Sequence, residues 1–564
     1  MTVIPEPHKK VPMMFRAQVG GRCQLQRIVK DEEPDAVRWA DEWVDKVYPE
    51  LPEPGGTVQP RTYKITWRLI TNCGMDDSVI RPVIGARGWV FYPGSSMKGL
   101  FRRACTKEQA AKYCGNLEQP GILRFQGGYP IDTSWTEGLV DIVHPQQGWQ
   151  VEDQAKKSSA FAQISLYKPT LRFSISSSAK EVDWDEVWQI WERAIATGLG
   201  SRVCAGYGHV ETSRETTVAE GLRVLYRTRL KGQGQAPKLL DGAGEFRPNI
   251  FRAALRGHAL RIFGGLTDDR TAKRLVEDLF GGVSGHGVVG RVGLRFQESR
   301  LALPKFQEGS SYEQTAYEVE GELSLLLARS LEDPTHEDTL KRLLAQLVQF
   351  AMVLGGFGKS WRRSDHRLFF EEYYENDRYK PLIGCHWQWL GNVALKRDVQ
   401  VRSLAQLSGF IDKVRETAEA WMRLQQVTPN SAKVADWREA WHPNRVQVWG
   451  RLAGSQEDSE AIRWFHGAYQ ERIPGVQPEG SIYKSQSAGL TGKVGQIGRL
   501  WHRMYPRVKL VGKKQDPEAK PEPRVTGEFL ELLTIFPDES RECEQFLRFL
   551  QGEPFEFQRL WGER

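Results

Sequence analysis

One segment of this chain constrains its fold more than any other, because it joins a β-prone run to a basic helix through a proline-glycine turn. Residues 89–92 (Trp-Val-Phe-Tyr) favour a strand, and Pro93-Gly94 ends it. Ser95 then stands where a side chain can cap a helix start. Apolar side chains recur at the spacing of one helix face, at Met97, Leu100, Phe101 and Ala104. The segment therefore predicts a strand, a turn and an amphipathic helix.

Two cations lie on one side of this predicted helix. Lys98 and Arg102 are four residues apart, so they share a face one turn apart. Free backbone N–H groups at a helix start attract anions, and neighbouring cations strengthen that attraction. The helix start is therefore a candidate phosphate site. The alternative is an ordinary amphipathic helix whose cations are solvated.

The same arrangement recurs later in the chain. Pro248 and Asn249 again form a turn and a candidate cap before a helix, which carries Arg252 and Arg256 four residues apart. A glycine-rich segment follows each copy. The interval from the proline to that segment is 105 positions in the first copy and 108 in the second. Two unlike motifs in the same order and spacing predict two related domains fused in one chain.

The chain resembles the RAMP superfamily, the repeat-associated mysterious proteins that form the backbone of type III CRISPR effector complexes. In that family a Pro-Gly-Ser-Ser helix start with a following basic residue, and a later glycine-rich loop, lie on a ferredoxin-like, RNA-recognition-type βαββαβ domain. Residues 93–102 match the first element almost throughout. The resemblance covers residues 60–215 well and 220–375 weakly. In the second copy, residues 272–296 also resemble a family pattern of a helix, Phe-Gly and a Gly-Arg strand.

The resemblance implies an α+β fold with two ferredoxin-like (RRM-like) RAMP domains in tandem, with insertions and a partly helical C-terminal region. The expected organisation is a lead-in segment at 1–60, a first domain at 61–217, the first part of a second domain at 218–384, and a helical insertion with a C-terminal part at 385–564 that completes or extends the second domain. Hydrophobic periodicity predicts strands at 63–70, 171–176, 222–230 and 446–452, and helices at 36–47, 182–196, 340–354, 403–424 and 457–472.

A candidate for chemistry lies between the first predicted strand and the basic helix. In the resembled family a Gly-Ile-Asp-Asn loop carries an aspartate needed to cut target RNA, and the matching residues here begin at Gly74. Asp76 is the match, and Asp77 falls where the family often has Asn. A carboxylate can hold a hydrated Mg²⁺ or help deprotonate a ribose 2′-hydroxyl. The resemblance therefore implies that Asp76 and Asp77 are catalytic, that Asp76 is a metal ligand, and that Mg²⁺ or another divalent cation is the cofactor for target RNA cleavage.

Without the resemblance, a solvated pair of loop carboxylates is the simpler interpretation. The second copy differs at this place. The connection that follows its predicted strand at 222–230, residues 231–241, is short and holds a single acidic residue, Asp241. We therefore expect the second copy to bind RNA with little or no cutting.

Candidate RNA-binding residues come from the helix starts, the glycine-rich segments and a C-terminal segment rich in arginine and aromatic residues. They are Ser95, Ser96, Lys98, Arg102, Gly198, Gly200, Ser201, Arg202, Asn249, Arg252, Arg256, Gly356, Gly358, Lys359, Arg362, Arg363, Arg499 and Arg503. In the C-terminal segment, Trp501 and Met504 are equally compatible with a core. His144, His209 and His366 lack metal-ligand spacing, and none is predicted to be catalytic.

Composition limits the class of protein. A chain of 564 residues can form more than one domain, and a net charge of +7 is modest, so local clusters must supply any nucleic-acid surface. Seven cysteines without a C-x-x-C pair favour reduced thiols over a zinc site. The sequence has no apolar run of membrane-spanning length, and residues 1–5 lack a signal peptide's hydrophobic region. We therefore expect a soluble, cytoplasmic protein without a membrane partner.

Three functions remain open. The first is an RNA-binding backbone subunit of a type III CRISPR ribonucleoprotein, which holds guide RNA and cleaves bound target RNA at one aspartate site in antiviral defence. The second is a non-catalytic capping subunit of the same kind of complex. The third is an endoribonuclease that processes the guide precursor, for which His209 is the one tempting base. The first implies guide RNA, target RNA and other CRISPR effector subunits, including a large polymerase-like subunit, as partners.

Overall fold

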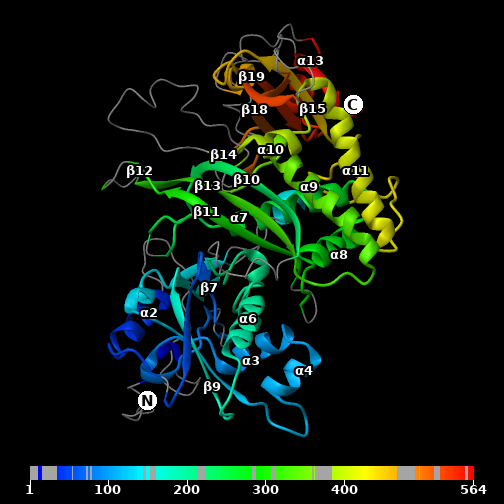
Figure 1. Cartoon of the computed structure of the whole chain (residues 1–564). Coiled ribbons are helices and arrows are strands. Elements are labelled where there is room, and N and C mark those ends of the chain that lie inside the picture. The colour runs from blue at the N-terminus through cyan, green and yellow to red at the C-terminus, as the bar shows by residue number, and fades with distance from the viewer. Residues whose placement is uncertain are drawn as a thin grey trace, which may run out of the picture.

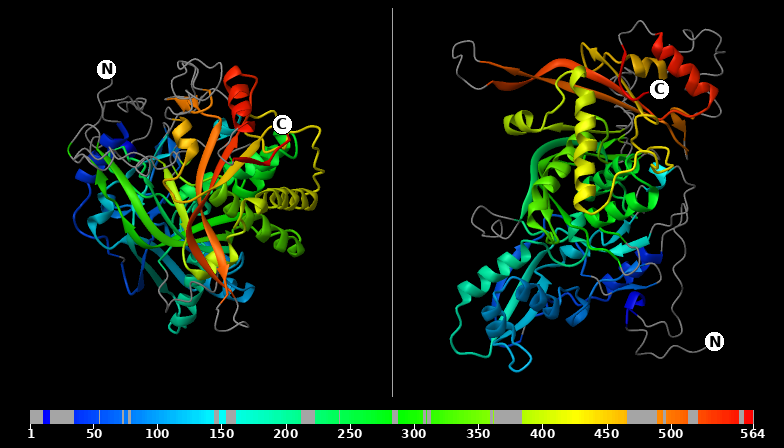
Figure 2. Two further views of the ribbon diagram at one scale, coloured as in Figure 1. Left: turned by 90° about the horizontal axis from the view of Figure 1, so that it is seen from above. Right: turned by 90° about the vertical axis from the view of Figure 1, so that its right-hand side faces the viewer.

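A computed structural model of the chain describes residues 11–15, 35–53, 55–71, 74–76, 79–143, 148–152, 161–211, 223–240, 242–282, 287–306, 309, 313–358, 361, 384–465, 489–493, 496–512, 521–552 and 557–563. The fold is α+β, as predicted, and is built around three main antiparallel sheets with helices packed against them (Figure 1). The sheets follow one another in chain order and form three tiers in Figure 1 and in the right-hand view of Figure 2. Within the described ranges, no helix is both long and apolar enough to cross a membrane.

The first sheet has the strand order β1-β9-β5, and its neighbours are antiparallel. Its strands are β1 (Gln59–Lys64), β5 (Leu123–Pro130) and β9 (Thr170–Ser177), with α3 (Gly94–Arg103) after β1 and α6 (Trp184–Ile195) after β9. Phe173 of β9 packs against Trp191 of α6, and both side chains are fully buried. After α6 the chain returns to the end of β1, where Val210 forms a β-bridge with Ile65.

Smaller elements surround this first sheet. A second group of strands has the order β3-β4-β7-β6, and β2 pairs with β8. Their bounds are β2 (Arg68–Leu69), β3 (Met75–Asp76), β4 (Val79–Ile80), β6 (Val140–Val143), β7 (Phe161–Ile164) and β8 (Leu166–Tyr167). Short helices are α4 (Lys107–Gln109), η3 (Ala110–Cys114), α5 (Gly148–Glu152) and η5 (Val203–Ala205), and α2 (Asp35–Asp45) packs Trp43 against Trp135.

The second sheet has the order β11-β13-β10-β14, with β12 paired to β13. Its strands are β10 (Val224–Gln235), β11 (Val292–Ala302), β12 (Lys305–Phe306), β13 (Gln314–Leu327) and β14 (Cys385–Trp389). Helices α7 (Asn249–Gly264) and α8 (Asp269–Phe280) precede β11, and α9 (Glu337–Val353) follows β13. Apolar side chains of α7 and α9 contribute much of the largest hydrophobic core, which lies against this sheet.

The third sheet has the order β18-β19-β15-β20. Its elements are β15 (Gln447–Ala453), α12 (Glu460–Phe465), β18 (Leu500–Val511), β19 (Glu522–Ile535), α13 (Arg541–Gln551) and β20 (Gln558–Trp561), and α10 (Asn392–Arg397) and α11 (Leu407–Leu424) come between β14 and β15. A short hairpin joins β16 (Gly492–Lys493) to β17 (Gln496–Ile497). Of the strands in this sheet, the sequence predicted only β15. The long β18–β19 hairpin extends away from the body, in orange, in the right-hand view of Figure 2.

The three sheets share one path of the chain. In each, the third strand pairs with the second strand on one side and the first on the other, and helices follow the first and third strands. The fourth strand pairs with the first in the second and third sheets, and the Ile65–Val210 bridge takes that place in the first sheet. This path therefore occurs in three sheets, whereas the sequence motifs occur in two copies.

The predicted elements outside this third sheet are largely present. Helices at 36–47, 182–196, 340–354 and 403–424 correspond to α2, α6, α9 and α11, and strands at 171–176 and 222–230 correspond to β9 and β10. Of the predicted helix at 457–472, α12 covers the first part, and residues 466–472 lie outside the described ranges. The strand expected at 63–70 is split into β1 and β2. Its alternating side chains are buried as predicted: Tyr63, Ile65, Trp67 and Leu69.

Both predicted helix caps are wrong. α3 begins at Gly94 with Pro93 in the N-cap position, so Ser95 lies inside the first turn, and α7 begins at Asn249 with Pro248 as its N-cap. The reason in α3 is tertiary packing: a Cβ on Gly94 would lie 2.0 Å from the carbonyl oxygen of Phe125 in β5. The helix can start this close to the strand only because residue 94 has no side chain.

A buried polar network connects the first sheet to the segment that precedes α7. Arg68 forms an ion pair with Glu245, with Nη2 and Oε2 2.5 Å apart, and both side chains are almost inaccessible. The indole N–H of Trp67 also donates to Glu245 Oε1, at 2.9 Å. Beside this pair, Arg247 forms an ion pair with the fully buried Asp141. Buried charges are stable only when their partners are correctly placed. These ion pairs therefore fix the position of the second tier relative to the first.

A Gly94→Ala variant tests the packing of α3 on β5. The added methyl group meets backbone that cannot rotate away, so we expect a loss of about 1–3 kcal/mol in the free energy of unfolding. Gly99→Ala is the matched control, because a Cβ there meets nothing within 4 Å and alanine is the better helix former, so it should stabilise by about 0.5–1 kcal/mol. Urea unfolding followed by circular dichroism measures both. Equal effects of the two substitutions would contradict the packing interpretation.

Candidate nucleic-acid interface

The helix α3 presents its polar residues to solvent. Met97, Leu100 and Phe101 are buried, as the spacing predicted. Ser95, Ser96, Lys98 and Arg102 are exposed on the opposite side, and Arg102 Nη1 donates to the carbonyl of Gly115 at 3.2 Å. The first turn therefore places two hydroxyls and a cation at a helix start, where backbone N–H groups favour an anion.

The first glycine-rich segment is rigidly packed. Gly198 and Gly200 have positive φ angles of 100° and 75°, and Arg202 also adopts the left-handed conformation with φ 59°. A Cβ on Gly200 would lie 2.1 Å from the carbonyl oxygen of Ile70, which accepts a hydrogen bond from Ser201 N at 2.9 Å. The glycines thus allow the segment to lie directly on the strand end, and its fold is fixed by backbone contacts.

The glycine-rich segment also lies next to the strand that leads into α3. The pKa of Tyr92 is raised mainly by burial, and the nearby backbone of Gly200 acts against that rise. Tyr92 is the residue before Pro93, so the start of α3 and the segment 198–202 belong to one local surface. Two of the sequence-predicted groups are therefore brought together within the first tier.

Predicted arginines from different motif copies influence one another electrostatically at the boundary of the first and second tiers. The positive charges of Arg256 and Arg202 act on Arg252, and its pKa falls to about 10, chiefly because of burial. Arg252 Nη2 donates to the carbonyl of Phe280, and Arg256 Nη1 donates to that of Gly281 at 2.8 Å, so both bind the C-terminal end of α8. Such carbonyl groups carry partial negative charge. An RNA-binding role for this arginine cluster stays a prediction.

His209 lies at the end of the first glycine-rich segment, and its side chain is buried. Its Nε2 lies 3.1 Å from the carbonyl of Val203 and 2.9 Å from that of Leu294 in β11, so the ring ties η5 to the second sheet. Burial lowers the pKa of His209 to about 4. A donor between two carbonyls with almost no solvent contact is a structural histidine.

The second glycine-rich segment meets an arginine from the third sheet. A Cβ on Gly356 would lie 2.3 Å from Nη2 of Arg503 in β18, and a Cβ on Gly358 would lie 2.8 Å from Sγ of Cys385. Burial lowers the pKa of Arg503 to about 10. The structure thus brings the predicted residues Gly356, Gly358 and Arg503 together, in a packed joint. The remaining predicted residues of this segment, Lys359, Arg362 and Arg363, lie outside the described ranges.

Arg499, directly before β18, and Trp501 within it have structural partners. Arg499 forms an ion pair with Asp538 at 2.8 Å and donates to the carbonyl of Phe536 at 3.3 Å. Trp501 is buried and packs against Trp361, with ring centroids 4.9 Å apart. The core alternative for Trp501 is therefore confirmed.

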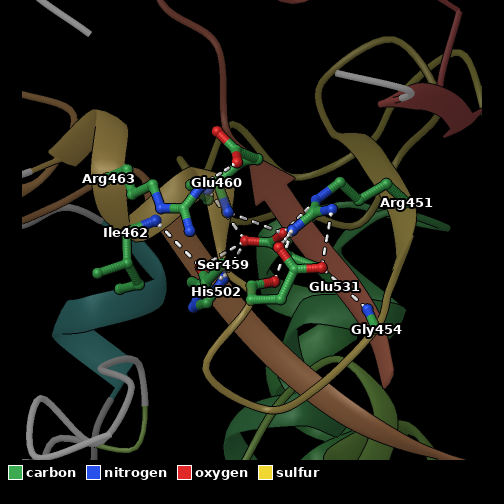
Figure 3. A network of polar contacts seen from close by, with 10 residues as sticks. Arg451, Gly454, Ser459, Glu460, Ile462, Arg463, His502 and Glu531 are labelled. Atoms are coloured by element: carbon green, nitrogen blue, oxygen red, sulfur yellow. Dashed lines mark hydrogen bonds and ion pairs between the residues drawn. The ribbon is translucent and has the colours of Figure 1, made fainter. Parts of the chain in front are cut away.

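The opposite side of β18 carries a buried polar network (Figure 3). Ser459 Oγ donates to Glu531 Oε1 at 2.6 Å, and His502 Nε2 lies 3.0 Å from the same oxygen. This serine, histidine and glutamate could be taken for a hydrolytic site, but Glu531 also accepts the backbone N–H groups of Glu460 and Ala461 and the guanidinium of Arg451. Since the serine and glutamate are both inaccessible, the network anchors the start of α12.

The predicted catalytic residue Asp76 ends the two-residue strand β3, which pairs with β4. The side chain of Asp76, and all of Asp77 and Asp241, lie outside the described residues. Among the side chains that are described, no group of three His, Cys, Asp or Glu converges as metal ligands. The catalytic and metal roles of Asp76 stay predictions.

The sequence did not predict the four residues that form the buried ion pairs between the first two tiers. Arg68 and Glu245 are 177 positions apart, and these two residues share no motif with Arg247 and Asp141. The sequence held no signal for these pairs, because Arg68 stands at a position of the alternating strand where a solvent-exposed side chain is expected.

No protein-family model and no curated protein sequence matches the chain. Among the solved structures similar to this chain are a chain of the Type III-B Cmr-beta and Cmr1. A chain of Cmr-beta bound to cognate target RNA is 20% identical, with a TM-score of 0.23, over 28% of this chain and 58% of that chain. Cmr1 from Pyrococcus furiosus, in its apo form, is 11% identical, with a TM-score of 0.31, over 60% of this chain and 99% of that one. TM-scores this low do not establish a common fold.

The buried His209 predicts a pH dependence of stability. Its folded pKa of about 4 lies below its ordinary value of 6.5, so the unfolded chain takes up a proton first as the pH falls. The stabilisation is fully present above pH 6.5 and is lost between pH 6.5 and 4. Urea unfolding at several pH values should therefore show a smaller decrease for His209→Gln than for the unsubstituted chain. Parallel pH curves for the two proteins would contradict this assignment.

The exposed face of α3 predicts a charge-dependent affinity for RNA. Lys98→Glu removes a cation and adds repulsion, so we expect weaker binding of single-stranded RNA and a salt dependence (log Kd against log salt) reduced by about one. Fluorescence anisotropy over a salt series measures both quantities. Lys396→Glu, an equally exposed charge reversal on α10, is the control and should change neither. Equal losses in both variants would indicate a non-specific effect of net charge.

Proposed function

We propose that this protein is an RNA-binding backbone subunit of a type III CRISPR ribonucleoprotein. The observation that carries the proposal is the joint between the first two tiers, where the glycine-rich segment of one motif copy meets the basic helix of the other. The resemblance of residues 93–102 to the RAMP superfamily gives this surface its expected ligand, a guide RNA. Target RNA and other effector subunits, including a large polymerase-like one, are the further proposed partners.

We further propose that each main sheet is the core of a ferredoxin-like unit. The support is the repeated path, with the third strand between the first and second and a helix after the first and third. The proposed array has three units, because residues 447–561 follow this path as well. The C-terminal region then extends the array by one unit.

Guide RNA is proposed to run along the start of α3 and the neighbouring glycine-rich segment. Hydroxyls of Ser95 and Ser96, backbone N–H groups and Lys98 suit phosphate oxygens. Farther along, Arg202, Arg252 and Arg256 add positive charge, with Glu277 as an opposing charge beside Arg256, and burial lowers the pKa of each arginine. A strand bound this way is held by its backbone, so its sequence remains free to pair with a target.

Target cleavage is proposed to depend on Asp76. Its carboxylate would take the proton from a ribose 2′-hydroxyl next to the scissile phosphate, and it is the residue that would hold a divalent cation. A bound cation supplies charge stabilisation to the phosphate oxygens. The second tier is proposed to bind without cutting.

A capping role without catalysis is the second candidate. It is favoured by the third sheet, which packs Arg503 against the glycine-rich segment of the second unit and so occupies a position where a separate subunit could otherwise dock. The precursor-processing alternative loses its support, because His209, the base on which it relied, is buried between two carbonyls.

An Asp76→Asn variant separates the backbone and capping roles. In a complex assembled with guide RNA and labelled complementary RNA, we expect cleavage at one position to disappear while binding of both RNAs is retained. Asp185→Asn is the control, because that carboxylate is exposed on α6 and should be dispensable. Unchanged cleavage at every position in the Asp76→Asn complex would exclude the catalytic assignment and favour the capping role.

A further inference from the structure

The first sheet packs helices on one face and presents polar side chains on the other. Phe101 of α3 packs against Phe125 of β5. Trp191 of α6 packs against Phe173 of β9 in the same way. The strand register places the intervening residues of β1, β5 and β9 on the opposite face, which we call the open face. Its exposed or half-buried residues are Thr62, Lys64, Arg124, Gln126, Tyr129, Arg172 and Ser176.

The centre of the open face is a cation without a protein anion. β1, β5 and β9 contain no aspartate or glutamate. Arg172 lies on the middle strand, between Thr62 of β1 and Tyr129 of β5. Among the residues that the structure describes, none forms a hydrogen bond or an ion pair with its guanidinium. Its charge is therefore available to a ligand.

The other two cations of the open face have weak partners. Arg124 Nη1 donates to the carbonyls of Gly121 and Leu123, at 2.6 and 3.1 Å, and these groups do not neutralise its charge. Lys64 lies 3.3 Å from Glu211, and both of these side chains are more than half exposed. Such an exposed ion pair contributes little and exchanges readily for another anion. The open face therefore carries a net positive charge.

The equivalent face of the second sheet is electrically balanced. β13 takes the middle place there, as β9 does in the first sheet, and it carries Glu320 and Glu322 on this face. Glu322 forms an ion pair with Arg227 of β10 at 3.1 Å, and Glu320 forms one with Lys231 at 3.8 Å. The two sheets share a strand path, so the path alone does not require the unbalanced charge of the first sheet. An excess of one sign attracts ligands of the other.

Two aromatic rings connect the open face to the start of α3. Phe91 and Tyr129 are stacked, with ring centroids 5.1 Å apart and planes at 16°, and both are half-buried. Tyr92 forms a β-bridge with Gly128, so residues 89–92 run beside β5. Pro93 and α3 follow directly. The open face and the start of α3 thus meet along this edge of the sheet.

We propose that the open face is a second contact surface for single-stranded RNA, continuous with the start of α3 around residues 89–92. This inference rests on the proposed function, because it extends the path of an RNA held at α3. Arg124 and Arg172 contact phosphate oxygens, and the hydroxyls of Thr62 and Ser176 donate to phosphate or sugar oxygens. The half-buried ring of Tyr129 stacks on a base.

An acidic protein segment fits this surface less well. The core of a protein–protein interface is formed by apolar and aromatic side chains that become fully desolvated. The residues of the open face include no aliphatic side chain, and their one aromatic ring lies at the margin, on Tyr129. Separated cations with hydroxyls between them are suited to a chain of phosphate groups.

A double substitution tests the surface by fluorescence anisotropy with a labelled single-stranded RNA of mixed sequence. Arg124→Gln with Arg172→Gln should raise Kd at least about tenfold, because two charge-assisted contacts are lost. The slope of log Kd against log salt should fall by about 1.4, since each lost phosphate contact removes about 0.7. Lys396→Gln with Lys413→Gln removes the same charge from exposed positions on α10 and α11 and should change neither quantity.

The Lys98→Glu variant, measured in parallel, distinguishes this inference from the proposed function. Weaker binding in Lys98→Glu, with unchanged binding in the Arg124/Arg172 double variant, would overturn the inference and leave the proposed function in place. An unsubstituted chain that binds no RNA would overturn both. Polyglutamate that binds as tightly as the RNA, and is lost to the same extent in the double variant, would replace the RNA by an acidic protein partner.

Ultraviolet cross-linking of the unsubstituted full-length chain to the same RNA needs no variant to fold. We expect RNA adducts at Tyr129 or Phe91, which trypsin releases in separate peptides that begin after Arg124 and after Arg87. Adducts in other peptides of the first tier, with none in these two, would contradict the proposal.

Discussion

The arrangement of the whole molecule depends on one buried ion pair, that of Arg68 with Glu245. Arg68 belongs to the first tier and Glu245 to the segment that leads into α7, so this contact decides how the second tier is placed on the first. Its desolvation is costly, and the cost is offset only because the guanidinium also donates to the carbonyls of Gly138 and Ser165. A pair that needs this complete set of partners tolerates only one relative placement of the tiers. The neighbouring Arg247–Asp141 pair repeats the constraint.

Because of that placement, the glycine-rich segments act as joints between units. The first lies on β11 through His209 and Leu294, and the second lies on β18 through Gly356 and Arg503. In both cases the segment follows the helix after the third strand of one sheet (α6 or α9) and contacts the second strand of the next sheet (β11 or β18). Close approach requires glycine within each segment, where a Cβ on Gly200 would meet the carbonyl oxygen of Ile70 in the same tier, and it requires glycine between tiers at Gly356, where a Cβ would meet Arg503. Rigid joints of this kind hold cationic groups from different units at fixed spacing, as recognition of a regular phosphate backbone requires.

The spacing of apolar residues predicted those helices and strands that pack against the sheet of their own tier. The apolar face of α3 could be predicted from residue spacing alone, because it faces the sheet of its own unit. Its start could not be predicted, since the carbonyl of Phe125, 31 positions beyond Gly94, determines which residue must lack a side chain. The strands β18, β19 and β20 of the third sheet were not predicted, for a related reason. Trp501 and His502 are successive residues of β18 and both are buried, so the alternation that marks a half-exposed strand is missing.

The candidate site shows the same division between local and distant causes. The spacing of Arg252 and Arg256 correctly predicted that they lie on one helix face. Their environment came from two distant places, the end of α8, whose carbonyls they bind, and Arg202 in the first tier. Neither neighbour is visible in the motif that contains them. An i,i+4 pair of arginines therefore identifies a charged surface, and the units packed around it determine whether that charge is solvated, satisfied by carbonyls or available to an anion. Here Arg202 of the first tier acts on Arg252 as a further positive charge, and Glu277 of α8 acts on Arg256 as a negative one, so residues outside the motif set the charge at this joint.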